Sequence, residues 1–192
     1  MRHCAVAVIA LTFAGLLAAC EDPNAGLLDP ALVTDTVEIA APTASGASLA
    51  SALDLTTLTL RFPEQAADAA SWDLALRLRD GQLAFVPAGT FGLRDPASGG
   101  LSRAGVTNPL AGITLETLRE APSSSSYVTD AAIALQAGSV YAARSRGISC
   151  GFTNAFTFAK FKVLSVDPAT GVASLAITVN RNCGDVRLVP EE

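Results

Sequence analysis

The strongest constraint on the fold is an alternation of apolar and polar residues with period two, which recurs along the chain. Leu58, Leu60 and Phe62 alternate with polar neighbours, and residues 173–179 follow the same pattern. Successive side chains of a strand point to opposite faces of a sheet, so this spacing predicts strands with one buried face. The chain is therefore expected to fold mainly as β-structure.

Turn dipeptides suggest how these strands pair. Asp80-Gly81 separates two alternating segments, so residues 71–86 are predicted to form a β-hairpin. Further strands are predicted at 140–144 and 152–166, and a turn at 167–171 leads into the strand at 173–179. Within 152–166 the apolar phase slips between Phe158 and Phe161, which suggests a bulge or a strand that changes sheet.

Helical signals are short. Residues 114–120 are compatible with one or two helical turns, and Asp130 is a plausible N-cap for a helix through Gln136. Residues 89–112 contain several Gly and Pro residues and are predicted to form a long loop. The expected fold class is all-β, a mainly antiparallel sandwich or curved sheet pair with one or two short helices.

The N-terminal segment has the three parts of an export signal. Arg2 is the positive residue, residues 5–17 are apolar apart from Thr12, and small residues lead into Cys20. This arrangement resembles the lipobox of bacterial lipoproteins. The resemblance implies cleavage before Cys20 and attachment of acyl chains to it, which would anchor the protein to a membrane without spanning it.

This interpretation divides the chain into three regions. Residues 1–19 are the expected signal peptide, residues 20–51 the lipidated cysteine and a flexible tether with a possible strand at 36–40, and residues 52–192 a single β domain. The expected location is the cell envelope. The apolar run is shorter than the roughly 20 residues that cross a bilayer, which disfavours a transmembrane anchor.

Charge excludes one class of partner. The chain has 13 basic and 18 acidic residues, and its two lysines, Lys160 and Lys162, form no basic stripe with the scattered arginines. Binding to nucleic acid is therefore not expected. Lys160 and Lys162 alternate with Phe161, so both are expected to be solvated and to protect the edge of a sheet.

Two cysteines remain once Cys4 leaves with the signal peptide and Cys20 is lipidated. In an oxidising compartment Cys150 and Cys183 are expected to form a disulfide. Two free thiols, or half of a metal site, are the competing interpretations. No histidine lies beyond His3, so the remaining chain lacks the imidazole of a Ser-His-Asp triad or a Cys-His dyad, and we expect no enzyme.

Several short motifs, in their order, resemble the HmuY family of haem-binding lipoproteins over roughly residues 57–180. These motifs are Trp72-Asp73-Leu74-Ala75-Leu76-Arg77, Gly99-Gly100, Leu118-Arg119-Glu120-Ala121-Pro122, Asp130, Tyr141 with Arg144, and Ala159-Lys160-Phe161-Lys162-Val163. The resemblance implies an almost wholly β lipoprotein of the outer membrane with a cleft for haem. In that family the axial ligands are His or Met, and residues 20–192 contain neither.

Haem is therefore expected to be held, if at all, in a cleft lined by aromatic residues. The candidate ligand-binding residues are Phe85, Phe91, Tyr127 and Tyr141. Either tyrosine could supply a phenolate to iron, although a tyrosine on a strand is more often a core or interface residue. The functional prediction is a membrane-anchored protein that binds a small apolar ligand, with an envelope interaction protein as the alternative.

One further pair has two interpretations. Trp72 and Asp73 are adjacent and are expected on opposite faces of a strand. Trp72 is either an aromatic wall for a ligand or a core residue, and Asp73 is expected to meet Arg77 or a turn amide. We favour the structural role for both.

Overall fold

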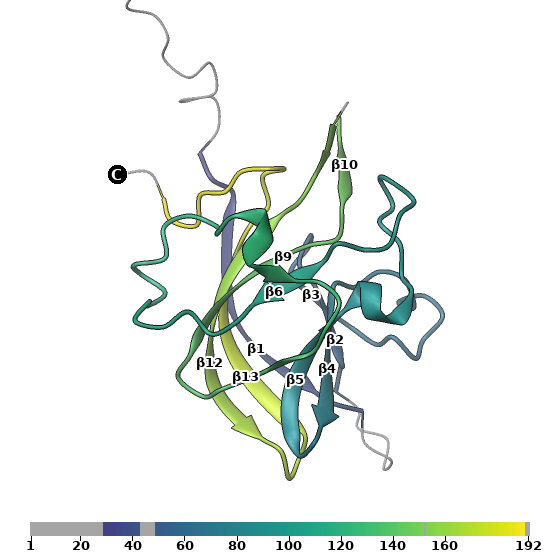
Figure 1. Ribbon diagram of the computed structural model, residues 1–192, viewed down its shortest axis with the longest axis vertical. Coiled ribbons are helices and arrows are strands. Elements are labelled where there is room, and N and C mark those ends of the chain that lie inside the picture. The colour runs from purple at the N-terminus through teal and green to yellow at the C-terminus, as the bar shows by residue number, and fades with distance from the viewer. Residues whose placement is uncertain (1–28, 43–48, 152, 191–192) are drawn as a thin grey trace, which may run out of the picture.

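The computed structural model describes residues 29–42, 49–151 and 153–190, and these residues form two facing antiparallel sheets (Figure 1). One sheet has the strand order β1-β13-β12-β9-β6-β7. Its strands are β1 (Leu32–Ala40), β6 (Gly105–Thr107), β7 (Tyr127–Val128), β9 (Val140–Arg144), β12 (Phe158–Asp167) and β13 (Val172–Asn180). The predicted all-β class is confirmed.

The second sheet is smaller, with the order β3-β2-β4-β5-β8. Its strands are β2 (Ala52–Asp54), β3 (Thr59–Arg61), β4 (Leu74–Arg79), β5 (Gln82–Pro87) and β8 (Ile133–Ala134). A separate hairpin of β10 (Ile148–Cys150) and β11 (Thr153–Ala155) projects from one end of the sandwich, and two 3₁₀ turns, η1 (Ala88–Phe91) and η2 (Ser124–Ser126), lie in loops (Figure 1).

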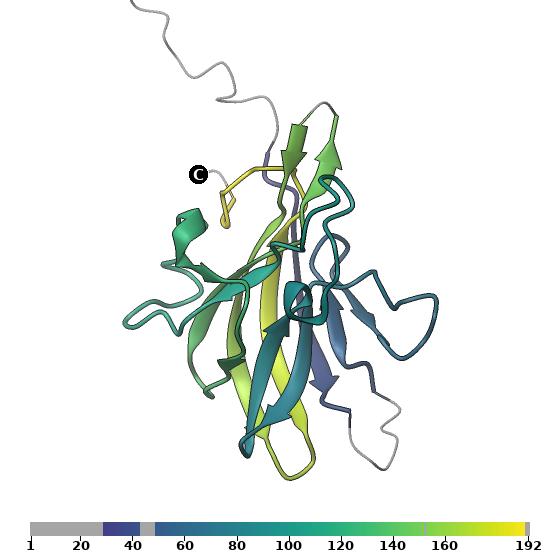
Figure 2. The same ribbon diagram turned by 45° about the vertical axis from the view of Figure 1, so that its right-hand side comes forward.

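The strands of the two sheets form two layers (Figure 2), and the side chains of the main core pack between them. Leu175 and Ile177 of β13 face this core, and so do Leu74 and Leu76 of β4. The alternating residues point to the other face of each sheet, as the period-two pattern predicts. Burial of these apolar side chains is the main force that holds the two layers together.

A second apolar cluster covers the outer face of the larger sheet. Val140 and Ala142 of β9 belong to it, whereas the intervening Tyr141 belongs to the main core. Leu118 and Leu188 cover this face from the loop before η2 and from the C-terminal segment. The domain is thus thicker than two layers on this side.

The hairpin predicted at residues 71–86 is confirmed as β4 and β5. Asp80 and Gly81 form its two-residue turn, with φ angles of 51° and 76°. Both angles are positive, as a type I′ turn requires, and this turn twists the strands in the sense that a sheet needs. The turn at 167–171 likewise joins β12 to β13.

The predicted bulge exists, but at another position. The register between β12 and β13 shifts between Val163 and Ser165, not between Phe158 and Phe161. The slip in apolar phase between Phe158 and Phe161 has a different cause, because Phe158 packs in the outer cluster and Phe161 in the main core, so both faces of β12 carry apolar residues there. The periodicity detected an interruption without locating its cause.

Four expectations about elements are wrong. The possible strand at 36–40 is present as part of β1, but β1 pairs with all of β13, so the domain begins before residue 52 and the tether does not extend to residue 51. The long loop expected at 89–112 contains β6, which pairs with β7 and β9. Within the expected helix at 130–136, Ile133 and Ala134 form β8, because they pair with Phe85 and Ala84 at the open edge of β5. Residues 114–120 form turns in place of a helix.

The predicted disulfide between Cys150 and Cys183 is confirmed. It ties the β10–β11 hairpin to the segment after β13, across 33 residues of chain. The expected signal peptide and Cys20 lie outside the described residues. Among the residues that are described, none forms a helix long and apolar enough to span a bilayer.

Candidate functional site

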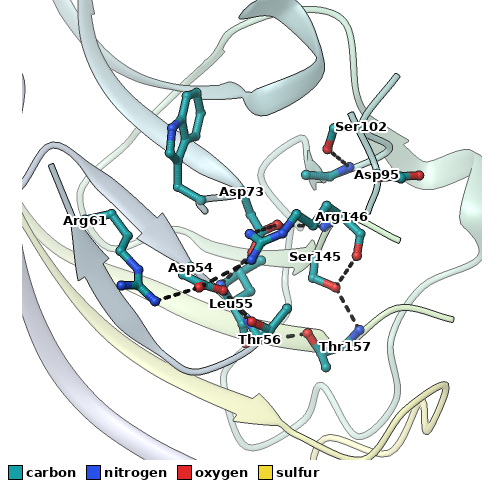
Figure 3. A network of polar contacts seen from close by, with 12 residues as sticks. Asp54, Leu55, Thr56, Arg61, Asp73, Asp95, Ser102, Ser145, Arg146 and Thr157 are labelled. Atoms are coloured by element: carbon teal, nitrogen blue, oxygen red, sulfur yellow. Dashed lines mark hydrogen bonds and ion pairs between the residues drawn. The ribbon is translucent and has the colours of Figure 1, made fainter. Parts of the chain in front are cut away.

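Three buried aspartates form the most distinctive polar feature of the domain (Figure 3). Asp54 ends β2, Asp73 directly precedes β4, and Asp95 lies in the loop after η1. All three converge on residues 145–147, which follow β9 of the other sheet. The network therefore joins the two sheets at one end of the sandwich.

Asp73 is at the centre of this network. One carboxylate oxygen accepts hydrogen bonds from the backbone N–H of Arg146, at 2.7 Å, and from its guanidinium, at 3.2 Å. The other oxygen accepts a 2.6 Å hydrogen bond from the backbone N–H of Leu55. Burial raises the pKa of Asp73 to about 6, although its contacts with Arg146 and Leu55 act in the opposite direction.

Asp54 shares the same arginine. Its carboxylate accepts hydrogen bonds from the hydroxyl and backbone N–H of Thr56, and it forms ion pairs with Arg61, at 3.1 Å, and Arg146, at 3.4 Å. Burial acts to raise its pKa, but the Thr56 hydroxyl and the charge of Arg146 outweigh it and leave the pKa below its ordinary value. Arg146 thus lies between two carboxylates.

Asp95 contacts Gly147, the residue that follows Arg146. It accepts hydrogen bonds from the backbone N–H of Gly147, at 2.7 Å, and from the side chain of Arg103, at 2.8 Å. Burial opposes its ionisation, yet these hydrogen bonds lower its pKa. A Cβ atom on Gly147 would lie 2.8 Å from the Asp95 carboxylate, so this close approach requires glycine.

Ser145 completes the network from the side of β12. Its hydroxyl accepts a hydrogen bond from the backbone N–H of Thr157 and donates one to the carbonyl of Arg146 (Figure 3). Taken together, these contacts give every carboxylate oxygen of the three aspartates a hydrogen-bond partner within the domain.

The network therefore has a structural role, in which it holds the loops at this end of the sandwich in place. Its carboxylates are bonded to the protein itself, so none is free to act on a substrate.

The four predicted ligand-binding residues do not line a common pocket. Phe85 and Tyr141 are fully buried in the main core, where both pack on Phe161 at ring-centroid distances of 5.6 and 5.1 Å. The Tyr141 hydroxyl donates to the carbonyl of Ala134 and accepts from the N–H of Gln136. Burial raises its pKa, which disfavours the phenolate that iron would need.

The other two residues lie elsewhere. Tyr127 belongs to the outer cluster and packs beside Phe158, whereas Phe91 ends η1 and packs edge-on against Trp72 at 5.3 Å. Phe91 is 44% exposed, and the guanidinium of Arg77 lies over its ring. Burial also raises the pKa of Tyr127. Within the described part of the chain, no three His, Cys, Asp or Glu side chains are placed so that they could hold a metal ion together.

A shallow depression of about 220 Å³ lies between η1 and the loops that follow β5 and β7. Its lining residues are Gly89, Thr90, Leu101, Ser102, Arg103, Thr129 and Asp130. Leu101, on its wall, is 60% exposed. The volume is below the roughly 300–1,000 Å³ of pockets that enclose a drug-sized ligand.

The adjacent pair Trp72 and Asp73 has a structural role, as favoured from the sequence. Trp72 is buried in a small cluster with Ala75 and Ala88, and its indole N–H donates to the carbonyl of Ala69. The charged partner of Asp73 was not foreseen, because Arg146 lies 73 residues away in sequence. Arg77 is not its partner, but the expected turn amide is present, because the backbone N–H of Leu55, in the turn after β2, donates to Asp73.

The expectation that Lys160 and Lys162 protect a sheet edge is wrong for both. β12 is an inner strand between β13 and β9, so it has no free edge. Lys160 is buried on the outer face, and its ammonium donates to the carbonyls of Leu115 and Leu118. It thereby fastens the loop that covers the outer cluster. Only Lys162 is exposed.

Comparisons with known proteins give no assignment, because no family model, curated protein or solved structure matches the chain. The resemblance to the HmuY family stays a prediction from the order of short motifs.

Proposed function

We propose that this chain is a lipid-anchored protein of the cell envelope whose β domain acts by binding another protein. The observation that carries the proposal is the surface of η1 and the loop after it, where the large apolar side chains of Phe91 and Leu101 are exposed and Leu101 lines a depression too small to enclose a haem-sized molecule. Exposed apolar surface of this kind is a mark of protein interaction sites. We call this surface, defined by Phe91, Leu101 and the lining of the depression, the loop-end face.

Its chemistry suits such an interface. Phe91 is held in place by Trp72 beneath it and Arg77 above it, so it presents a pre-ordered aromatic ring. Arg103 and Asp130 supply charge of both signs at the depression. Aromatic residues and arginine are enriched at the centres of protein interfaces, where they contribute most of the binding energy.

Site-specific photo-crosslinking in intact cells tests the proposal. A photoreactive phenylalanine analogue is placed at Leu101, and in a matched strain at Leu164, which is 47% exposed on β12. The proposal predicts a discrete adduct with one envelope protein from position 101 and none from position 164. Absence of an adduct at 101, or equal adducts at both positions, would contradict it.

Titration with hemin tests the small-ligand alternative. The proposal predicts no change in the Soret band at micromolar protein and hemin, because Phe85 and Tyr141 are committed to the core. A saturable shift that is weakened by Phe91→Ala would favour haem capture at the loop-end face and would overturn a protein partner as the main function.

A further inference from the structure

Arg144 is a buried cation. Only 7% of the residue is exposed. Its guanidinium donates to the carbonyl of Arg103, at 2.9 Å, and to the carbonyl of Ser124, at 3.4 Å. Among the described residues no Asp or Glu lies within ion-pair distance of it. A charge removed from water without a counter-ion costs free energy that two carbonyls recover only in part.

Aromatic rings hold this guanidinium in a fixed position. Its central carbon lies 5.1 Å from the ring centroid of Tyr127 and 4.9 Å from that of Phe156. A second guanidinium, that of Arg103, lies 4.8 Å from the same Phe156 ring. Asp95 forms an ion pair with Arg103 and acts on Arg144 only from beyond ion-pair distance, so Arg144 is the guanidinium of this stack without a directly bonded carboxylate among the described residues.

An independent observation comes from Tyr127 in the same stack. The residue is 94% buried, since 6% of it is exposed, and its hydroxyl has no hydrogen-bond partner in the described part of the structure. Burial raises the pKa of this phenol, so the hydroxyl keeps its proton and remains a donor. Buried hydroxyl groups without a partner are rare and need an explanation, such as a missing ligand.

We infer that Arg144 and Tyr127 form a binding site for an oxyanion, either a carboxylate or a phosphate group of a small ligand. The planar guanidinium can donate two parallel hydrogen bonds to such a group, and the phenol can donate a third. The contact with the Ser124 carbonyl is the longer of the two that Arg144 makes, so an anion is expected to replace it from the side of η2. This site does not depend on the protein partner proposed above.

The test is calorimetric titration of the full-length protein in detergent with inorganic phosphate and, separately, acetate. Sodium chloride at matched ionic strength is the reference. Saturable binding of phosphate alone or of acetate alone identifies the preferred oxyanion. If neither gives binding beyond that of chloride, the inference is overturned.

Two tyrosine variants test whether the anion binds at Tyr127. Tyr127→Phe removes the unpartnered hydroxyl and keeps the ring, so we expect about a tenfold or greater loss of affinity, as for a hydrogen bond to a charged group. Tyr141→Phe is the matched control, because the Tyr141 hydroxyl is bonded within the core, and its affinity should equal that of the wild type.

Arg144→Lys keeps the charge but removes the forked donor, and it should also weaken binding. Circular dichroism establishes that each variant is folded. Wild-type affinity in Tyr127→Phe, or an equal loss in Tyr141→Phe, would contradict the assignment even if Arg144→Lys fails to fold.

Discussion

Asp73 illustrates how single residues define this domain. Its carboxylate is fully buried, yet each oxygen is bonded, and through Arg146 it connects the start of β4 to the end of β9. Removing one partner of a buried ion pair is usually far more costly than the pair is stabilising, because an unpaired charge remains. Asp73 is therefore expected to matter for the pH dependence of stability.

The raised pKa of Asp73 predicts the direction in which the stability of the domain changes with pH. Because it rises from 3.8 in the unfolded chain to about 6 in the folded protein, the folded state binds the proton more tightly. The resulting stabilisation is complete below about pH 4 and is lost as the pH rises through about 6, with a total of at most about 3 kcal/mol.

Urea unfolding at several pH values between 4 and 7 measures this effect. The stability advantage of the wild type over Asp73→Asn should shrink as the pH rises across this range. Asp35→Asn, an exposed position on β1, controls for the loss of one negative charge. Parallel stability curves for the wild type and Asp73→Asn would contradict the raised pKa.

In the absence of ligand, Tyr141→Phe and Tyr127→Phe are expected to have different effects on the free energy of unfolding. Tyr141→Phe removes a hydroxyl that makes two hydrogen bonds, so it should lower the free energy of unfolding by about 1 kcal/mol. Tyr127→Phe removes a buried hydroxyl without a described partner and should leave stability unchanged or raise it. Thermal unfolding in buffer without phosphate or carboxylate measures both, and a loss in Tyr127→Phe equal to that in Tyr141→Phe would be inconsistent with this account.

Individual residues were the hardest part to predict from the sequence. Asp73 was expected to meet Arg77 or a turn amide, and it does meet the turn amide of Leu55, but its charged partner Arg146 follows a strand of the other sheet. Asp95 lies in a Gly-rich loop and gave no signal of burial, since its contacts with Arg103 and Gly147 depend on the folded loop. Lys160 was misassigned because periodicity assigns a face but does not say what covers it.

At the scale of elements, the β4–β5 hairpin is the unit that the local sequence determines most completely. Asp80-Gly81 and the alternating flanks fix both its turn and its register, and both were predicted from local sequence. β8 was mistaken for helix because a two-residue strand has no periodicity of its own. It forms only because the edge of β5 offers backbone partners.

Gly81 allows a direct test of this turn. Its φ of 76° disfavours a side chain, although no atom lies within 4 Å of a Cβ at this position. Gly81→Ala should therefore destabilise the domain by about 1 kcal/mol through backbone strain alone. Gly100→Ala, where φ is not positive, should have a much smaller effect in the same denaturation experiment.

At the scale of the whole molecule, the last third of the chain is closed by a covalent bond. The disulfide between Cys150 and Cys183 joins residues 33 positions apart in the sequence. The segment between them contains β12 and β13, which are long inner strands of the larger sheet. The cysteine count predicted this bond, and it fits a protein that folds outside the reducing cytosol. The predicted start of the domain was wrong because the possible strand at 36–40 lies between Pro30 and Pro42, and the sequence did not show that β1 pairs with β13, more than 130 residues further along the chain.

Loss of the disulfide should destabilise the domain without changing its fold. The double variant Cys150→Ser, Cys183→Ser is expected to lose about 3 to 4 kcal/mol in the free energy of unfolding, according to the chain-entropy model. Wild-type protein in reductant should show the same shift in its urea midpoint. An unchanged midpoint in both would mean that the bond contributes little.

The central claim is that this domain works in the envelope, attached through Cys20. Metabolic labelling with radioactive palmitate, followed by membrane fractionation, tests it most directly, with Cys20→Ser as the paired variant. The account predicts label and membrane association in the wild type, and loss of both in Cys20→Ser. A wild-type protein without label, or a Cys20→Ser variant that stays in the membrane fraction, would contradict it.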